Sequence, residues 1–369
     1  MKLIPLVIIL IFSSFSYSQS THFVITGKVI DKNSKQPLAG ASVFAQNTTF
    51  GIATDAEGSF NLKLPNGGYE LVATFTGYET ESIRISTSAA DKDIIIELSH
   101  KEKTMEEVSI VATNEVKDGW QKYGQFFTEN FIGKTQLSRQ CIIKNPDVLK
   151  FYFSKKRNRL KVMANEPLII INDALGYQIK FAIDSFTYEY AGNASQFTGY
   201  PLFEEMPGTP DQQAVWQQNR IKTYLGSELH FMRSLYNKTL TEDGFEVQFM
   251  VKNNDNEIPI PLKNIYAALN YSKDDSTKTA EFKPNQSEMI VIYKKAKPEE
   301  NYFENDSNDK KDYQVSTLTI ANGESIVIEE NGYFFDQKDI TTNDYWGFKK
   351  TGDMLPYDYV PSPNQADPK

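Results

Sequence analysis

The sequence predicts a mainly β protein with some α: an N-terminal sandwich of about seven strands, then a mixed α+β domain with an antiparallel sheet and one long central helix. Three observations support this fold class. Aromatic residues make up 13% of the chain, and such side chains suit half-buried pleated sheets. Short strands and turns alternate from Phe23 to residue 98. A long 3.6-residue period is found in residues 216–237.

Residues 1–18 have the pattern of a secretory signal peptide. Lys2 precedes an apolar run over residues 3–12, and small residues at Ser16 and Ser18 precede an expected cleavage before Gln19. The apolar run is shorter than the roughly 20 residues of a membrane-spanning helix, and no other stretch reaches that length. We therefore expect an exported protein of the periplasm or outer membrane, with no transmembrane segment in the mature chain.

Strand and turn signals place the sandwich between residues 19 and 99. Residues 59–64 alternate apolar and polar side chains, as a half-buried strand does. Residues 55–58 suit a tight hairpin loop with a positive φ at Gly58, and residues 65–68 give a second hairpin signal. Strands that follow one another at such short intervals are typical of a small β-sandwich.

Turn and core residues recur in one fixed order between residues 27 and 79. They are Gly27, Val29, Asp31, Pro37, Leu38, Gly40, Ala41, Val43, Gly51, Thr54, Asp55, Gly58, Phe60, Tyr69, Leu71, Gly77, Tyr78 and Glu79. This pattern resembles the carboxypeptidase-like regulatory domain. The resemblance implies a transthyretin-like (prealbumin-like) sandwich, also described as a carbohydrate-binding-like fold, which recurs in exported proteins and outer-membrane receptors of Bacteroidetes.

The resemblance does not imply peptidase activity. In zinc carboxypeptidases catalysis belongs to a separate domain that carries a His-x-x-Glu ligand pair. The histidines of this chain, His22, His100 and His230, have no Glu at that offset. The regulatory-type domain alone therefore implies a folding or docking module, and we expect no metal and no cofactor.

After the sandwich we expect a linker over residues 100–116, an α+β domain over residues 117–360 and a disordered tail over residues 361–369. Residues 105–112 of the linker resemble the short strand that joins such sandwiches to the plug of TonB-dependent receptors. In the α+β domain the sequence predicts a helix that ends at Gly133, strands over residues 139–203, and a hairpin across Asn322 and Gly323. Asp211 is the expected N-cap of the central helix.

Motifs in the second half extend the resemblance over nearly the whole mature chain. They are Trp120, Cys141, Trp216, Asn219, Arg220, Tyr224, Gly226, Ser227, Trp346 and residues 131–133, 145–146, 166–168, 175–177, 199–203, 230–235 and 353–359. This pattern is similar to an exported Bacteroidetes family that pairs the regulatory-like sandwich with a C-terminal domain of its own. It implies an architecture and a compartment, and it implies no activity.

Residues 216–237 have two contrasting sides at about 100° per residue. One side is an apolar stripe: Ile221, Leu225, Leu229, Met232, Leu235 and Tyr236. The other side gathers polar and aromatic residues: Trp216, Asn219, Arg220, Tyr224, Ser227, His230, Phe231 and Ser234. Two interpretations stay open. The polar groups pair with neighbouring backbone between two layers, or they line a groove that binds a partner.

The formal net charge of −9 argues against a nucleic-acid partner, because phosphate binding requires a basic surface. The one basic cluster, residues 155–159, straddles an expected hairpin tip and fits a solvated turn. Asp306, Asp309 and Asp312 lack the Gly and Glu of a calcium loop, so we interpret them as a solvated acidic loop.

Three functions fit the sequence. The first, which we favour, is a non-enzymatic binding or scaffold protein of the cell envelope, whose partner is an envelope protein or a glycan. A hydrolase is the second, because Ser227 and His230 share one helix face, although a mid-helix serine lacks the exposed elbow of acyl transfer. The third is glycan binding through exposed aromatic residues, with Trp120, Trp216 and Trp346 as candidates.

Overall fold

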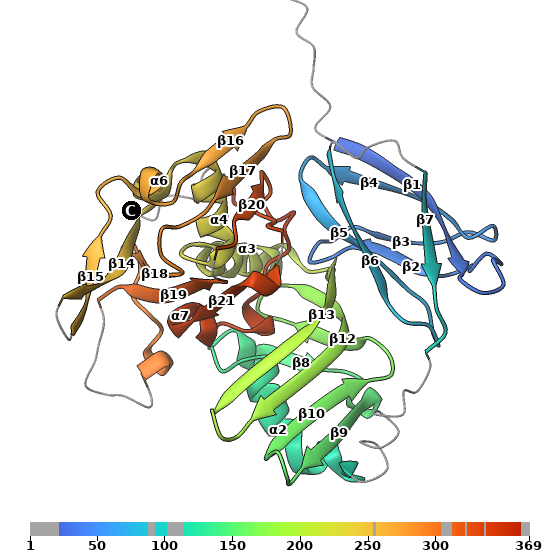
Figure 1. The fold of residues 1–369 in the computed structure, drawn as a ribbon. Coiled ribbons are helices and arrows are strands. Elements are labelled where there is room, and N and C mark those ends of the chain that lie inside the picture. Colours follow the sequence, from blue (N-terminus) through green and yellow to red (C-terminus); the bar gives the residue numbers. More distant parts are fainter. Residues whose placement is uncertain are drawn as a thin grey trace, which may run out of the picture.

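The computed structural model describes residues 22–87, 93–101, 114–253, 256–303, 312–321, 323–335 and 337–362. Figure 1 shows three bodies: a sandwich in blue, a middle lobe in green, and a C-terminal lobe in yellow to red. We define the sandwich as residues 22–101, the middle lobe as residues 114–224 and the C-terminal lobe as residues 225–362. Strands dominate all three, so the predicted mainly β fold class is confirmed.

The sandwich consists of two facing sheets. One has the order β4-β1-β7 and contains β1 (His22–Asp31), β4 (Ser59–Pro65) and β7 (Asp93–Leu98). The other has the order β3-β2-β5-β6 and contains β2 (Ser42–Ala45), β3 (Gly51–Ala53), β5 (Gly68–Thr74) and β6 (Glu81–Ser86). Ile25, Leu64 and Leu71 are fully buried between the sheets. The predicted strands are confirmed, and Gly58 has the expected positive φ, 69°.

The middle lobe is one antiparallel sheet with a helix against it. The order is β8-β11-β12-β10-β9, with β13 also paired to β12. Its elements are α2 (Gly119–Phe131), η2 (Ser138–Gln140), β8 (Cys141–Ile143), η3 (Pro146–Val148), β9 (Leu149–Ser154), β10 (Arg159–Ala164), β11 (Leu168–Asn172), β12 (Tyr177–Glu189) and β13 (Ala194–Glu205). Phe127 and Phe131 of α2 pack on the aromatic rings of the sheet. The helix ends as predicted, because Gly133 has a φ of 114°.

The C-terminal lobe has two antiparallel sheets around α4. The larger, in the order β15-β14-β18-β19-β21, contains β14 (Phe245–Asn253), β15 (Asn256–Pro261), β18 (Glu288–Tyr293), β19 (Gln314–Ile320) and β21 (Ile340–Asn343). The smaller contains β16 (Ser272–Asp274), β17 (Thr279–Phe282) and β20 (Ile326–Glu329). The helices are α4 (Glu228–Asn237), α5 (Leu240–Asp243), α6 (Ile265–Ala268), α7 (Asp344–Phe348) and the short η4 (Glu300–Phe303), η5 (Gln337–Asp339) and η6 (Thr351–Asp353). Phe231, Met232 and Leu235 of α4 are fully buried in this core.

The predicted long central helix is in fact two helices. Helix α3 (Pro210–Tyr224) ends before Gly226, whose φ of 79° is left-handed, and α4 starts after Ser227. Glycine adopts this conformation without the steric cost of a Cβ, so the chain turns here although the apolar period continues. The N-cap prediction is also wrong: Thr209, and not Asp211, caps α3 in a capping box with Gln212.

The predicted hairpin across Asn322 and Gly323 is wrong as well. β19 pairs with β18 and β21 in the larger sheet, whereas β20 pairs with β17 in the smaller one. The turn signal is real, because Gly323 has a φ of 80°. The chain uses this turn to pass from one sheet to the other, and the local signal cannot distinguish the two outcomes.

The sandwich is docked on the other two bodies. Phe44 of β2 and Val72 of β5 form a small buried cluster with Leu202 of β13. The turn between β2 and β3 adds hydrogen bonds: Asn47 N–H donates to the carbonyl of Pro201 (2.7 Å), and Thr49 N–H donates to the carboxylate of Asp358 (2.9 Å). The sequence did not indicate this interface. Whether the domains fold separately at the predicted boundaries stays a prediction.

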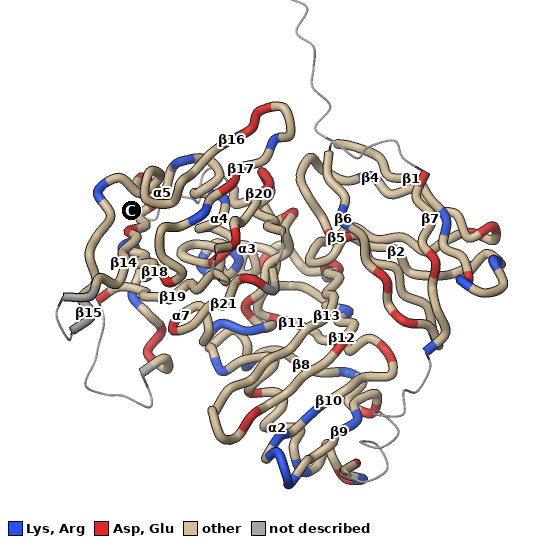
Figure 2. The backbone as a smooth tube through the Cα atoms, in the orientation of Figure 1, with Lys and Arg blue, Asp and Glu red and all other residues tan. Residues whose placement is uncertain are grey.

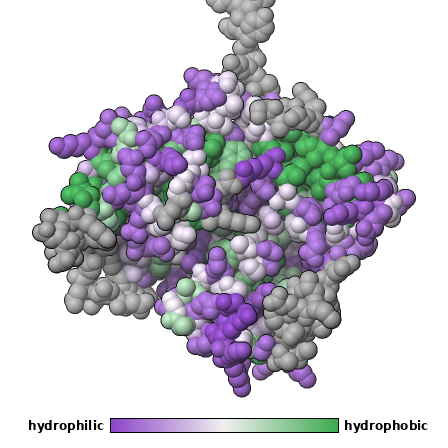
Figure 3. Space-filling view, viewed as in Figure 1, coloured by the Kyte–Doolittle hydropathy of each residue, from purple (hydrophilic) through white to green (hydrophobic). Residues whose placement is uncertain are grey.

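Docking leaves part of the sandwich's apolar surface uncovered. Figure 3 shows hydrophobic residues gathered on its face in this view. Ile52 of β3 and Ile95 of β7 are 42% and 66% exposed. Figure 2 shows the charged residues along the backbone; the basic residues 155–157 are exposed at the turn between β9 and β10, as predicted.

Several predictions lie outside the described residues. These are the signal peptide at residues 1–18, the linker strand at residues 105–112, Asp306, Asp309 and the tail from residue 363 onward. Among the helices that the structure does describe, none combines the length and the apolar composition of a membrane span.

Candidate functional site

On α3, the predicted polar side holds the turn between β11 and β12. The Nε1 of Trp216 donates to the carbonyl of Asp173 (2.8 Å), and the Nδ2 of Asn219 donates to the carbonyl of Ala174 (2.8 Å). The indole of Trp216 also fills the space beside Gly176, where an added Cβ would lie 2.2 Å from the ring. These two side chains therefore satisfy backbone carbonyls at the edge of the middle sheet.

Arg220 continues the same pattern and is 8% exposed. Its Nε donates to the carbonyl of Leu175 (2.7 Å), and its terminal nitrogens reach the carbonyl of Gly176 (3.2 Å) and the carboxylate of Glu205 (2.9 Å). The guanidinium lies 3.8 Å from the centroid of the Tyr177 ring. Arg220 thus pairs with groups of the fold, and it also lines a small polar pocket of about 400 Å³ together with Tyr177, Glu205 and Asp358.

The predicted pair at the start of α4 is engaged with backbone groups. Ser227 is the N-cap of α4, and its Oγ accepts a hydrogen bond from the backbone N–H of His230 (3.1 Å). The Nδ1 of His230 accepts a hydrogen bond from the backbone N–H of Gly226 (3.1 Å). Burial lowers the pKa of His230 to about 4, so the imidazole is neutral near pH 7. Both groups hold the break between the two helices.

The remaining predicted residues are buried in the fold. Ser234 Oγ lies 2.8 Å from the carbonyl of His230 and 2.7 Å from the carboxylate of Asp243. The ring of Tyr224 packs on the imidazole of His230, with centroids 4.8 Å apart. The guanidinium of Arg233 lies over the face of the Tyr224 ring. Phe231 is fully buried in the core of the C-terminal lobe.

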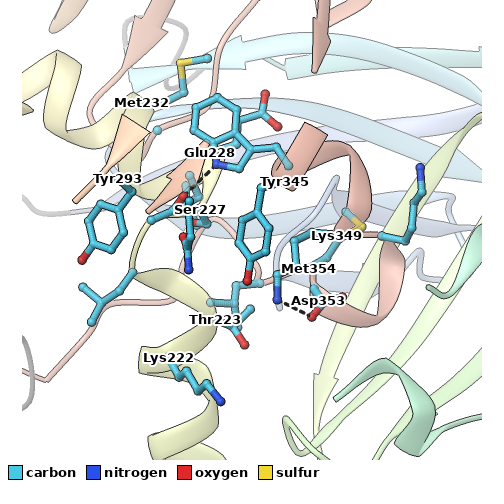
Figure 4. Close-up of a pocket in the computed structure, with 18 of the residues that line it drawn as sticks. Lys222, Thr223, Ser227, Glu228, Met232, Tyr293, Tyr345, Lys349, Asp353 and Met354 are labelled. Carbon is cyan, nitrogen blue, oxygen red and sulfur yellow. Dashed lines mark hydrogen bonds and ion pairs between the residues drawn. The ribbon is translucent and has the colours of Figure 1, made fainter. Parts of the chain in front are cut away.

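A cavity of about 600 Å³ lies where the three bodies meet, and we call it the junction cavity. It is lined by the end of α3, the start of α4, the segment from β18 to residue 299, α7 and residues 349–357, with Asn47 contributed by the sandwich. Most of its wall is apolar or aromatic; examples are Leu225, Met232, Tyr293 and Trp346. Figure 4 shows Glu228 and Met232 at one end of the cavity and Lys222 at the other.

One wall of the cavity carries an ion network. The ammonium of Lys349 pairs with the carboxylates of Glu299 and Asp353, and Asp353 also accepts a hydrogen bond from Thr135 (2.9 Å). Burial acts to lower the pKa of Lys349, but Asp353, Tyr345 and Glu299 outweigh it and hold that pKa above its usual range. Burial raises the pKa of Asp353. These charges compensate one another.

Two ionisable residues of the wall lack such compensation. Glu228 is half-buried at the first turn of α4, and burial raises the pKa of its carboxyl to about 7. Lys350 is also half-buried, and burial lowers the pKa of its ammonium. Within the part of the chain that the structure describes, neither side chain has an ion-pair partner.

Four buried polar side-chain atoms of the same wall have no hydrogen-bond partner among the described residues. They are the Oδ1 of Asn47, the Oγ1 of Thr223, the Oε1 of Gln314 and the Oγ1 of Thr351. Thr223, Gln314 and Thr351 are 9%, 8% and 0% exposed. Buried polar atoms are usually hydrogen-bonded, so these atoms are candidates to bind a ligand or an ordered water.

Sequence reasoning missed this set of residues. Lys222 with Thr223 and Lys350 with Thr351 are two of six Lys-Thr pairs in the sequence, and in another pair Thr135 serves the ion network instead. So short a motif carries no signal. Of the three candidate tryptophans, Trp216 and Trp346 are 6% and 7% exposed and offer no exposed platform, whereas Trp120 is half-buried.

Comparison with known proteins bears on the N-terminal part of the chain. Residues 25–110 match the family described as CarboxypepD_reg-like domain. The sandwich is a CarboxypepD_reg-like domain. The expected resemblance is thereby confirmed for this domain, and the match ends before the residues that form most of the junction cavity.

The TonB-dependent receptor P39 of Formosa agariphila is 28% identical to this chain over 112 residues. The match covers 30% of this chain and 10% of the receptor, so the chain spans about a tenth of the length of this curated relative. Two solved structures are similar in part. One is a DUF3823 family protein from Bacteroides ovatus, with 13% identity, a TM-score of 0.18 and coverage of 50% of this chain and 82% of that chain.

The other is 3-chlorocatechol 1,2-dioxygenase from Rhodococcus opacus, with 12% identity, a TM-score of 0.18 and coverage of 22% of this chain and 62% of that chain. With TM-scores this low, neither structure carries an argument about what this chain does.

Proposed function

We propose that this chain is an exported, non-enzymatic binding protein of the cell envelope, and that the junction cavity is its binding site. The observation that carries the proposal is the cavity. Its volume of about 600 Å³ suits a small molecule, and its wall combines apolar residues with a few buried polar groups. A position at the junction of several folded bodies is also typical of binding sites.

The arrangement of Ser227 and His230 supports a non-enzymatic role. A hydrolase requires a base within hydrogen-bond reach of the nucleophile, oriented to take its proton. Here the hydroxyl of Ser227 accepts from a backbone N–H, and the Nδ1 of His230 accepts from Gly226. Both groups are engaged with backbone at the helix break.

The cavity is tested by filling it. Ala296 is half-buried in the cavity wall, so Ala296→Phe places a ring in the binding space; Ala191→Phe, on the exposed turn between β12 and β13, is the matched control. Each protein is recovered from envelope extract and its bound molecules are identified by native mass spectrometry. We expect wild type and Ala191→Phe to retain the same ligand and Ala296→Phe to lose it. Equal retention by all three contradicts the proposal.

Export is supported by the signal-peptide pattern and by the likeness to a TonB-dependent receptor. Sequencing the N-terminus of native protein from the envelope fraction tests it. We expect a mature chain that begins near Gln19. Protein that keeps Met1 and remains in the cytoplasm would refute export while leaving the cavity as a binding site.

A further inference from the structure

We propose that the junction cavity binds a small amphipathic anion, which is a carboxylate attached to an apolar body. This inference rests on the proposed function, which makes the cavity the binding site, and it adds the chemical class of the ligand. Three observations carry it: an excess of cations around the cavity, two buried hydroxyls without partners among the described residues, and a largely apolar wall.

Cations gather around the cavity although the whole chain has a net charge of −9. Five lysines line it, against the three acids Glu228, Glu299 and Asp353. Glu299 and Asp353 are already paired with Lys349. The remaining lysines leave the cavity positive on an otherwise acidic protein, and a local positive potential concentrates anions.

Two of these lysines are free to meet an anion. Lys295 donates to the carbonyl of Glu242 (2.9 Å), and Lys297 lies 3.6 Å from the carboxylate of Asp312. Lys222 and Lys350 have neither kind of partner within the residues that the structure describes. Lys222 is exposed at the rim and Lys350 is half-buried. An ammonium that is only partly solvated binds a carboxylate more strongly than one in bulk water.

Each of these lysines is followed by a buried threonine that lines the same cavity. The hydroxyls of Thr223 and Thr351 have no partner among the described residues, and both residues are at least nine-tenths buried. A hydroxyl donates a hydrogen bond to a carboxylate oxygen, so each Lys-Thr pair supplies one charge and one donor. A carboxylate satisfies these two hydroxyls, whereas the amide oxygens of Asn47 and Gln314 accept hydrogen bonds and need a donor instead.

The rest of the wall suits an apolar body. Leu225 and Leu229 border the cavity from the helix break, and Phe334, Trp346 and Leu355 border it from the C-terminal segments. These side chains gain from contact with an alkyl chain or ring and offer it few hydrogen bonds. The cavity therefore matches a molecule that is charged at one end and apolar along the rest.

The test uses three probes that share a ten-carbon chain: decanoate, decyltrimethylammonium and decyl maltoside. Each is titrated below its micelle concentration into the full-length protein at pH 8, and binding is measured by calorimetry. We expect saturable binding of decanoate, with the cationic and neutral probes at least about tenfold weaker, a difference of about 1.4 kcal/mol. A parallel titration with acetylated trileucine separates a peptide carboxylate from a fatty acid as the source of the head group; binding of either supports the carboxylate assignment.

Variants then assign the head-group site. Lys222→Met and Lys350→Met are expected to weaken decanoate about tenfold each, and Thr223→Val and Thr351→Val about threefold. The controls are Lys156→Met at the exposed turn after β9 and Thr128→Val in α2, whose hydroxyl already donates to Gly124. The valine variants should melt no lower than wild type, because they remove an unsatisfied buried hydroxyl.

Glu228 distinguishes an anion from a cation. At pH 8 its carboxyl is ionised, so it repels a bound carboxylate and would attract a bound ammonium. Glu228→Gln is therefore expected to tighten decanoate about threefold. A weaker decanoate complex in this variant, or tighter binding of decyltrimethylammonium than of decanoate by wild type, overturns the assignment of an anion but leaves the cavity as a binding site. If none of the probes binds, both the anion assignment and the proposed role of the cavity as a binding site fail.

Discussion

The helices on the two sides of Gly226 use their polar residues differently. On α3, the side chains of Trp216, Asn219 and Arg220 donate to carbonyls of residues 173–176, and none of these donors reaches the cavity. At the end of α3 and the start of α4, Thr223 and Glu228 line the junction cavity, and neither side chain has a partner among the described residues. The predicted polar side thus holds a sheet edge over its first half, whereas the cavity is lined by Ser227 of that side, by Thr223 and Glu228 beside it, and by members of the apolar stripe such as Leu225 and Leu229.

This difference shows what a polar helix side can and cannot indicate. The gathering of polar and aromatic residues on one side of the helix indicates correctly that other parts of the protein cover that side, because a solvated face does not require aromatic residues. It cannot indicate whether the covering layer supplies hydrogen-bond partners. That depends on where the helix breaks, and four predictions test the contrast across the break.

Arg220→Ala should have the largest effect. It removes a buried guanidinium and leaves the carbonyls of Leu175 and Gly176 without their donor, which we expect to lower the free energy of unfolding by about 3 kcal/mol. Arg157→Ala, at an exposed turn, is the control and should change it by less than about 0.5 kcal/mol. Chemical denaturation measures both. A loss below 1 kcal/mol for Arg220→Ala would show that α3 does not hold the sheet edge.

Low pH should destabilise the turn between α3 and α4, because His230 becomes protonated. Its folded pKa of about 4 lies below the ordinary histidine value of 6.5, so the unfolded chain binds the proton more readily and stability is lost as pH falls from 6.5 to 4. The loss attributable to this group is on the order of 2–3 kcal/mol by pH 4. His230→Asn keeps an acceptor for the Gly226 N–H and cannot titrate, so its unfolding curves should lose that component. If the free energy of unfolding falls with pH equally in the variant and in wild type, protonation of His230 does not destabilise the fold.

Gly226→Ala tests the turn between the helices. Gly226 has a φ of 79°, which is unfavourable for alanine. The new Cβ would also lie 2.4 Å from the Oε1 of Gln314 and 2.6 Å from the ring of Tyr293. Gly77→Ala, at a φ of 85° with nothing within 4 Å of the Cβ, isolates the cost of the backbone conformation. We expect a loss of about 2 kcal/mol at Gly226 and about 1 kcal/mol at Gly77. Equal losses of stability in the two variants would mean that Gln314 and Tyr293 move aside for the new Cβ at no cost in free energy.

Ser227→Ala should have the smallest effect on stability. It removes the N-cap of α4, which costs about 1 kcal/mol. The same variant tests the hydrolase hypothesis on a panel of p-nitrophenyl esters. We expect wild type and Ser227→Ala to give the same background rate; turnover by wild type that disappears in the variant would establish an enzyme at this position.

Much of the fold could be predicted because its signals are local. The turns at Gly58 and Gly133 need a positive φ, and the sequence places glycine there. The break at Gly226 was missed because a glycine inside a helix costs only about 1 kcal/mol relative to alanine, so the continuing apolar period outweighs it. The pairing of β19 was missed because a turn residue does not specify which sheet the next strand joins.

The candidate site was predicted only in part. Residues of the helix break were singled out, but Asn47, Gln314 and Thr351 come from three other segments and carry no local pattern that marks them. The polar atoms of the wall share one feature, which is that they have no hydrogen-bond partner among the described residues. A sequence cannot show this feature, because it depends on how distant segments come together in the fold.

The contact between Thr49 and Asp358 joins residues that are 309 positions apart in the sequence. Contacts of such separation form late, because a long loop must close before they contribute. The sandwich can complete its own core from neighbouring strands, yet Phe44 and Val72 stay open to water until the middle lobe arrives. Asp358 then secures the turn between β2 and β3. A partly folded chain in which this docking has not yet taken place therefore exposes an additional apolar face, and such faces promote self-association.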